Sequence, residues 1–301
     1  MSALHPADRR AIPAARAAQR ARVSRSLWRV ALYVLAIAGA GAFLIPFFWM
    51  LSTSLKPFSE LYIFPPNFLP LAPRPRNYAD AWSSADFTRY TLNTLFITAA
   101  TLVGVLASSA VCAFGFARLR FVGRDALFIC VLASVMLPQQ VTLIPLYIIF
   151  KQLHWLNSFK PLIIPAWFGG GALNIFLLRQ YFLTIPRELD EAARIDGCST
   201  FGIFWRIMLP LAKPVLAVVT IFHVQNTWTD FLGPVLYLNT PDKFTLALGV
   251  YSFQSQLLQG GLSHQEQMMA VAAVMVLPIV LIFIFAQRYM VRGVVLSGIK
   301  G

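Results

Sequence analysis

Charged residues are scarce in this 301-residue chain, at 12% of the total, whereas 58% of the residues are hydrophobic. A soluble domain carries roughly 25% charged residues and fewer than half apolar ones. A chain of this size cannot bury so much apolar surface in water. The composition therefore excludes a soluble enzyme, a disordered protein and a fibrous protein, and it indicates a polytopic membrane protein.

Cysteines and catalytic motifs are also sparse. There are three cysteines, an odd number that excludes a disulfide framework. None of the six lysines follows a glycine, so there is no P-loop to cradle nucleotide phosphates. The four histidines are scattered, without a His-Glu-x-x-His motif, and no serine nucleophile elbow is present. We expect no catalysis, metal or cofactor in this chain, and any ATP and Mg²⁺ to be bound by a separate subunit.

Long uncharged runs divide the chain. A membrane helix needs about 20 apolar residues, and six runs come near that length, although the fourth is short and the fifth is interrupted by Asp230. We therefore predict an all-α fold with six transmembrane helices. The runs are 30–55, 90–117, 126–150, 161–178, 214–229 and 267–287. The first is too long for a signal peptide and lacks a clear cleavage site, so we expect a retained helix.

The basic residues are distributed unevenly between the two sides of these spans. Segments 1–29, 118–124, 179–213 and 288–301 hold 18 of the 25 Lys and Arg residues, while acidic residues divide evenly. The positive-inside rule then places both termini in the cytoplasm. A net charge of +13 does not indicate nucleic acid here, because the basic residues are spread over four separate loops.

The boundaries follow from these spans. A basic segment, 1–29, precedes the first helix, 30–55. A proline-rich extracytoplasmic loop covers 56–89, which is either an ordered cap or a plain connector. A core of five helices, 90–287, contains a cytoplasmic loop, 184–214, and the chain ends in a cytoplasmic tail, 288–301.

The loop 184–214 predicts two short helices joined at a glycine. Pro186 suits a helix start, and Gly197 fits the left-handed position that ends a helix. Ser199 or Thr200 can cap the second helix, which Pro210 ends. Four apolar residues at helical spacing predict one apolar face on that second helix: Phe201, Phe204, Trp205 and Met208. Such a face either lies in the membrane interface or fits a groove on a partner.

This loop resembles the EAA signature of permeases of ABC importers. Ten positions over 24 residues match its spacing: Glu191, Ala192, Ala193, Asp196, Gly197, Phe204, Ile207, Leu209, Pro210 and Pro214. Cys198 departs from it, since the family usually has Ala there. The resemblance extends from about Asn93 to the C-terminus, and the tail from Gln287 is similar to the second permease subunit of maltose-type sugar importers.

The resemblance implies a type I importer permease, found in a prokaryotic cytoplasmic membrane, that imports a solute, most simply a sugar. It implies a second permease subunit, a dimer of ATPase subunits and an extracytoplasmic solute-binding protein as partners. The cytoplasmic loop would dock on the ATPase through residues 197–205, oriented by Glu191 and Asp196. The loop 251–264 would meet the binding protein.

Polar residues also interrupt two of the spans. His223, Gln225, Asn226 and Asp230 lie in and after the fifth run, and His223, Asn226 and Asp230 are spaced to share a helix face. Gly170 and Asn174 interrupt the fourth run. These residues either bond neighbouring helices or line a solute path, and both interpretations stay open. A secondary transporter or an assembly scaffold with an interfacial loop is the alternative function.

Overall fold

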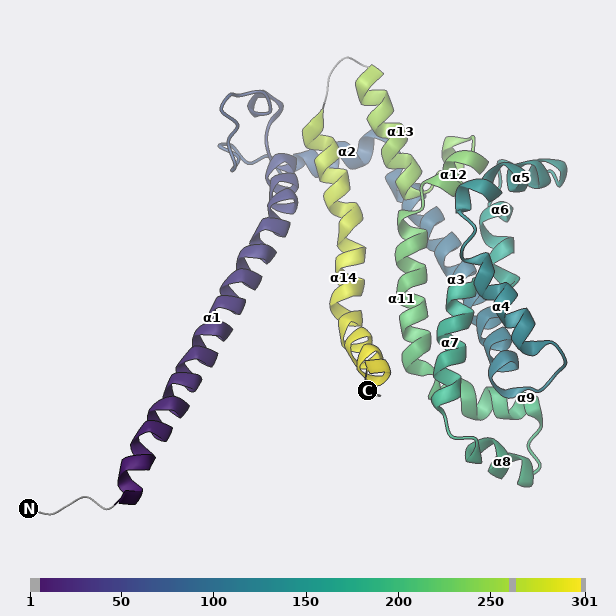
Figure 1. Ribbon diagram of the computed structural model, residues 1–301. Coiled ribbons are helices and arrows are strands. Elements are labelled where there is room, and N and C mark those ends of the chain that lie inside the picture. Colours follow the sequence, from purple (N-terminus) through teal and green to yellow (C-terminus); the bar gives the residue numbers. More distant parts are fainter. Residues whose placement is uncertain (1–5, 260–263, 299–301) are drawn as a thin grey trace, which may run out of the picture.

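The computed structural model describes residues 6–259 and 264–298, with side chains described over 27–138, 140–258 and 264–285. Every regular element in these ranges is a helix, which confirms the all-α prediction. Most of the side chains of segments 1–29 and 288–301 lie outside the described residues. The helices form a bundle with α8 and α9 at one end and α2 and α12 at the other (Figure 1).

The helix α1 runs from Pro6 to Ser54 and stands largely apart from the bundle (Figure 1). Its part Leu27–Ser54 is long and apolar enough to cross a membrane, and none of its most apolar stretch is buried. It contacts α14, Gln265–Gly298. An apolar helix left this bare needs lipid or another subunit around it.

The centre of the bundle is α3, Phe87–Arg118, which packs against α7, Ala172–Thr184, and α11, Lys213–Thr229. Two glycines allow close approach to α3. A Cβ added at Gly170 would lie 2.6 Å from the Ser109 Cβ, and one at Gly104 would lie 2.7 Å from the Trp167 ring. Small residues at such contacts are how apolar helices pack in membranes.

The six uncharged runs do not all become single helices. The run 126–150 divides into α4, Arg124–Ser134, and α5, Gln139–Gln152. Pro138 sits at the break, because proline has no backbone N–H to continue a helix and disfavours helical backbone before it. Within the described residues four helices are long and apolar enough to span a membrane, or five when a bent pair counts as one span.

The fourth and fifth runs are also interrupted. Lys160–Trp167 forms α6 and the 3-10 turn η2, and three glycines with positive φ, Gly169 to Gly171, separate it from α7. The fifth run is α11, which ends at Thr229. The chain continues through α12, Leu232–Tyr237, the turn η4, Pro241–Lys243, and α13, Leu246–Gln259. Residues 251–259, expected to lie in a loop, are therefore helical, and 260–263 lie outside the described residues.

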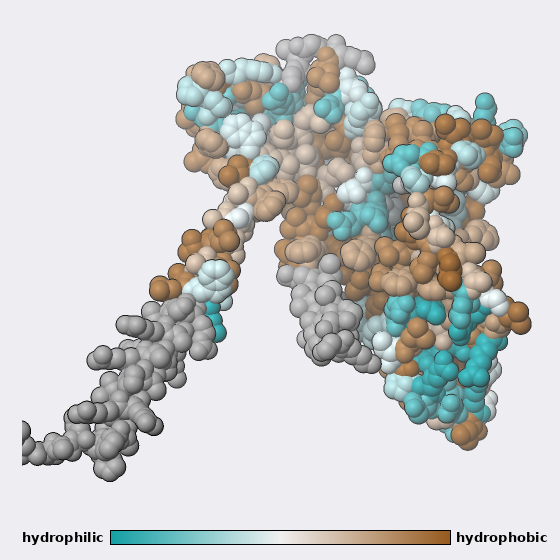
Figure 2. Space-filling view, viewed as in Figure 1, coloured by the Kyte–Doolittle hydropathy of each residue, from teal (hydrophilic) through white to brown (hydrophobic). Residues whose placement is uncertain are grey.

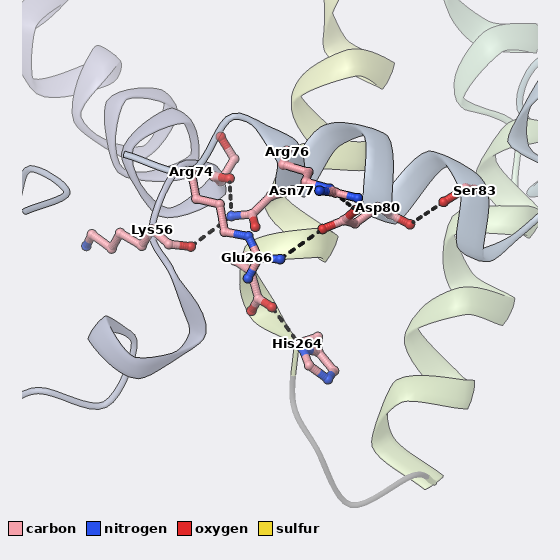
Figure 3. A network of polar contacts seen from close by, with 9 residues as sticks. Lys56, Arg74, Arg76, Asn77, Asp80, Ser83, His264 and Glu266 are labelled. Carbon is pink, nitrogen blue, oxygen red and sulfur yellow. Dashed lines mark hydrogen bonds and ion pairs between the residues drawn. The ribbon is translucent and has the colours of Figure 1, made fainter. Parts of the chain in front are cut away.

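A polar network fixes the segment after α1. This segment contains η1, Phe58–Glu60, and α2, Arg76–Ser84. Asn77 donates to the carbonyls of Ser54 and Lys56 at 2.9 and 2.8 Å, and Arg74 pairs with Asp80 at 3.2 Å (Figure 3). Nearby, His264 and Glu266 at the start of α14 are 2.8 Å apart. These contacts hold the segment in place, and its helix α2 packs against α14.

Side-chain polarity follows this architecture. Brown, apolar side chains dominate a band across the middle of the bundle, interrupted by a teal patch, whereas teal, hydrophilic ones gather over α8 and α9 at one end and lie among brown ones at the other (Figure 2). Such an apolar band between two ends that carry hydrophilic side chains is the surface that a membrane requires.

Candidate functional site

Two short helices project from one end of the bundle and form the first candidate site. They are α8, Glu188–Ile195, and a second segment built from α9, Thr200–Ile203, a π-helical turn, Phe204–Met208, and α10, Leu209–Leu211. The second segment meets α11 at a bend of 74°. We call residues 184–214 the coupling loop.

Local caps explain why the coupling loop folds this way. Gly197 has φ +78°, and the amides of Gly197 and Cys198 donate to the carbonyls of Arg194 and Ala193 at 3.0 and 2.8 Å. This pattern is a Schellman motif, which ends α8. Ser199 caps α9 by accepting from the Gly202 amide at 3.1 Å. Both sequence predictions, the glycine end and the serine cap, are confirmed.

The π-helical turn accommodates Pro210. Proline cannot donate the backbone hydrogen bond of an α-helix, and in the wider turn the amide of Leu209 donates to the Phe204 carbonyl. Helix α11 then begins at Lys213 with Pro214 in its first turn, as predicted. Pro210 therefore lies inside the second segment, which ends directly after it, at Leu211.

The predicted single apolar face is divided into two. Phe204 and Met208 are buried, in a core with Phe114 and Phe182 of the helices above. Phe201 and Trp205 point the other way, are 71% and 62% exposed, and stack with ring centroids 6.4 Å apart. One side of the second segment thus anchors the loop, and the other leaves two aromatic rings uncovered.

The other signature residues of the loop differ in their burial. Ala193 is buried under the loop and Ile207 is half-buried. The exposed ones are Glu191, Ala192, Asp196, Gly197 and Pro210. Glu191 on α8 and Asp196 at its end are therefore exposed, on the same loop as the exposed rings of Phe201 and Trp205.

A buried ion pair ties the coupling loop to α3. Arg118 Nε lies 3.4 Å from Asp190 Oδ2, with side chains 3% and 11% exposed. Arg118 Nη2 also donates to the Ile185 carbonyl at 2.7 Å. Burial raises the pKa of the Asp190 carboxyl, and the nearby Arg118 guanidinium opposes that shift. Sequence reasoning missed this pair. Arg118 directly follows the uncharged run 90–117, and nothing in the sequence around it indicates a partner 72 positions away.

The second candidate site is a polar cavity of about 120 Å³ inside the bundle. His223 and Asp230 line it, as does Thr227 between them. His223 Nε2 lies 2.8 Å from Thr101 Oγ1 of α3 and 3.3 Å from Thr227 Oγ1. Asp230 accepts from the Gly233 amide at 3.2 Å. Hydroxyl, imidazole and carboxylate groups thus converge where they can bind water or the hydroxyls of a solute.

The other predicted path residues lie elsewhere. Gln225 and Asn226 are exposed on α11, so Asn226 does not share the cavity with His223 and Asp230. Asn174 donates to the Gly170 carbonyl at 2.8 Å, and Gly170 is buried against α3. The contacts of these last two residues are those of helix packing, and their role in a solute path stays a prediction. Sequence reasoning missed the four threonines of the cavity, Thr94, Thr101, Thr227 and Thr245, because a threonine among apolar residues gives no distinct signal.

Comparison with known proteins decides the family. Residues 100–296 match the family described as the inner membrane component of binding-protein-dependent transport systems. The chain belongs to this family. The match covers more than half of the chain and includes the whole coupling loop and the polar cavity residues His223 and Asp230.

Relatives and a solved structure agree with this assignment. The permease is 34% identical over 280 residues to the arabinooligosaccharides transport permease AraQ of Bacillus subtilis, across 92% of this chain and 97% of AraQ. It is 31% identical over 245 residues to the diacetylchitobiose uptake permease NgcG of Streptomyces coelicolor, across 81% and 80%. The fold matches a bacterial ABC transporter that imports alginate, with TM-score 0.77 and 23% identity over 88% of this chain and 97% of that one.

Proposed function

We propose that this permease is one of two membrane subunits of an ATP-driven sugar importer. A separate pair of ATPase subunits grips the coupling loop, and an extracytoplasmic protein delivers the sugar at the opposite end. ATP-driven closure of the ATPase pair then moves the loop and, through it, the helices of the bundle.

The observation that carries this proposal is the uncovered aromatic pair of the coupling loop. Phe201 and Trp205 stack on each other at the outer end of the loop, while Phe204 and Met208 hold the same segment in the core. Rigid aromatic residues on a buried base are typical energetic centres of protein interfaces. The ion pair between Arg118 and Asp190 then passes force from α8 to α3.

Orientation follows from charge. The coupling loop and the 118–124 turn lie at the end of the bundle to which the positive-inside rule assigns the cytoplasm. Both termini then lie in the cytoplasm, and the cap formed by 56–89 lies outside, where a binding protein arrives. The membrane is a prokaryotic cytoplasmic membrane, in keeping with the two relatives.

The solute path runs along α11. Polar residues in an apolar helix are costly unless they meet water or another subunit. Gln225 and Asn226 are exposed on one face of α11, and His223 and Asp230 line the cavity on another. We place Gln225 and Asn226 at the path between the two permease subunits, with the cavity behind it. A carbohydrate fits these hydroxyl-binding groups, and both named relatives transport oligosaccharides.

A cross-linking experiment tests the docking. A photoreactive amino acid at Phe201 should capture an ATP-hydrolysing subunit in the assembled importer, whereas the same probe at Phe43 of α1, 82% exposed, should capture lipid or the second permease. Capture of lipid alone at Phe201 would instead favour an interfacial loop on a secondary transporter or scaffold.

Paired substitutions separate docking from folding. Trp205→Ala removes an exposed ring, so the permease should insert normally while ATPase docking weakens by about 2 kcal/mol, or about thirtyfold. Phe204→Ala empties the core and should reduce the amount of folded permease instead. Glu191→Lys and Gly197→Pro should lower uptake without loss of insertion.

Uptake competition across a panel of sugars in vesicles, with stimulated ATP hydrolysis as readout, identifies the solute.

A further inference from the structure

The end of the bundle that holds the coupling loop also has a pocket, separate from the exposed aromatic rings of the loop. An open pocket of about 530 Å³ lies between the turn that joins α3 to α4 and the start of α8. Its volume is in the range of ligand-binding clefts, about 300–1,000 Å³. Its walls include three arginines, one carboxylate and a glycine: Arg120, Arg124, Arg187, Asp125 and Gly123.

The pocket has an excess of positive charge. Arg124 Nε forms an ion pair with Asp125 Oδ1 at 2.9 Å. The hydrogen bond from Arg124 lowers the pKa of the Asp125 carboxyl, which stays ionised. Within the described part of the chain, Arg120 and Arg187 form no salt bridge. Arg120 and Arg187 therefore line the pocket without a salt-bridge partner, although the charge of Asp190 acts on Arg187: burial raises the pKa of the Asp190 carboxyl, and the nearby Arg187 opposes that rise. Arginine is suited to phosphate recognition.

Backbone amides add to this charge. Helix α4 has 11 residues and starts after Gly123, which has φ +80° and provides no side-chain cap. The first amides of a helix lack partners within it and attract anions. Asp125 and Ala126, in that first turn, line the pocket.

The setting of the pocket indicates the source of the anion. At the tip of the same turn, Val122 is fully exposed and Phe121 is 44% exposed. The α4 helix that follows exposes Leu127 and Ile129. Apolar side chains beside arginines at the end of an apolar band are the surface that meets headgroups and the first part of the acyl chains.

We propose that this pocket binds the phosphate group of an anionic phospholipid of the inner leaflet. Arg120 and Arg187 contact the phosphate, and the turn around Val122 contacts the acyl chains. Because Arg187 is the N-cap of α8, the lipid links the α3–α4 turn to the coupling loop. The site rests on these contacts and not on docking of an ATPase.

The test uses the full-length permease in the assembled importer and short-chain phosphatidylglycerol as the probe, with short-chain phosphatidylcholine and inorganic phosphate as comparison arms. Titration calorimetry should show phosphatidylglycerol binding tightest. Each basic residue near an anionic surface contributes about fivefold in affinity, so Arg120→Gln with Arg187→Gln should weaken binding about 25-fold. Arg76→Gln, at the other end of the bundle and 80% exposed, is the matched control and should change nothing.

Three results would overturn the proposal. The first is an unchanged affinity for phosphatidylglycerol in the double variant, with assembly of the complex verified by gel filtration. The second is inorganic phosphate binding as tightly as the lipid, with no effect of Val122→Ser on either, which would assign the pocket to free phosphate. The third is binding of lipid only after the ATPase subunits are removed, which would assign the pocket to a protein contact.

Discussion

We expect that removal of either member of the Arg118–Asp190 pair destabilises the permease. The two losses differ in their cause, because one variant leaves a buried arginine and the other a buried carboxyl. The two side chains are almost fully buried and lie 3.4 Å apart. Breaking a buried ion pair leaves an uncompensated charge and costs about 3–5 kcal/mol. We expect about 3 kcal/mol for Asp190→Asn, since Arg118 keeps its hydrogen bond to the Ile185 carbonyl.

The two single variants should differ in their dependence on pH. Asp190→Asn leaves a buried arginine, which stays charged at any usable pH, so its cost should be the same at pH 5 and pH 8. Arg118→Gln leaves a buried carboxyl, whose pKa burial already raises. The stability of that variant is greatest at low pH and is lost as the pH rises through the raised pKa, because ionisation then places a carboxylate in the core without its ion-pair partner, with only the more distant Arg187 and Arg194 to offset it.

The measurement is unfolding of the purified permease in mixed micelles by titration with SDS, followed by tryptophan fluorescence. The double variant, Arg118→Gln with Asp190→Asn, should be less destabilised than the sum of the single ones, because it buries no charge. A coupling energy near zero in this cycle, or a loss for Arg118→Gln that does not grow between pH 5 and pH 8, would refute the reasoning.

Two further predictions concern packing and turns. Gly170→Ala should cost about 1–3 kcal/mol by the same unfolding assay, because the added Cβ would lie 2.6 Å from Ser109, whereas Gly39→Ala, with nothing within 4 Å, should cost nothing; equal effects would contradict the contact. Asn157 has φ +56°, and its side-chain oxygen accepts from Thr240 Oγ1 at 3.0 Å. Asn157→Ala should therefore cost about 1–3 kcal/mol while Asn157→Asp retains most of the stability, and the reverse order would be inconsistent with an acceptor role.

Much of the fold can be predicted from the sequence. Long uncharged runs predict membrane helices, because lipid offers no hydrogen bonds to backbone N–H and C=O groups, and a helix pairs these groups within itself. The ends of the coupling-loop helices follow from Gly197 and Ser199, whose conformations depend on neighbours within five residues. The break after α4 was not predicted, because run length alone predicted one helix over 126–150, although Pro138 within that run is a residue that interrupts helices.

The sequence-based predictions that were wrong concern features that depend on neighbours far away in the chain. Helical spacing placed Phe201, Phe204, Trp205 and Met208 on one face, but a short helix buries whichever side meets the bundle, and the core contacts took only Phe204 and Met208. The same holds for Asn226, which the spacing grouped with His223 and Asp230.

The sequence by itself determined the class, the family and the local caps of this permease, because composition, motif spacing and short-range hydrogen bonds are properties of the chain. Only the tertiary structure decided that Arg118 meets Asp190, that threonines from α3 complete the cavity around His223, and that Arg187 joins Arg120 beside the start of α4. These groups are brought together by the packing of helices, and no local pattern records which helices will be neighbours.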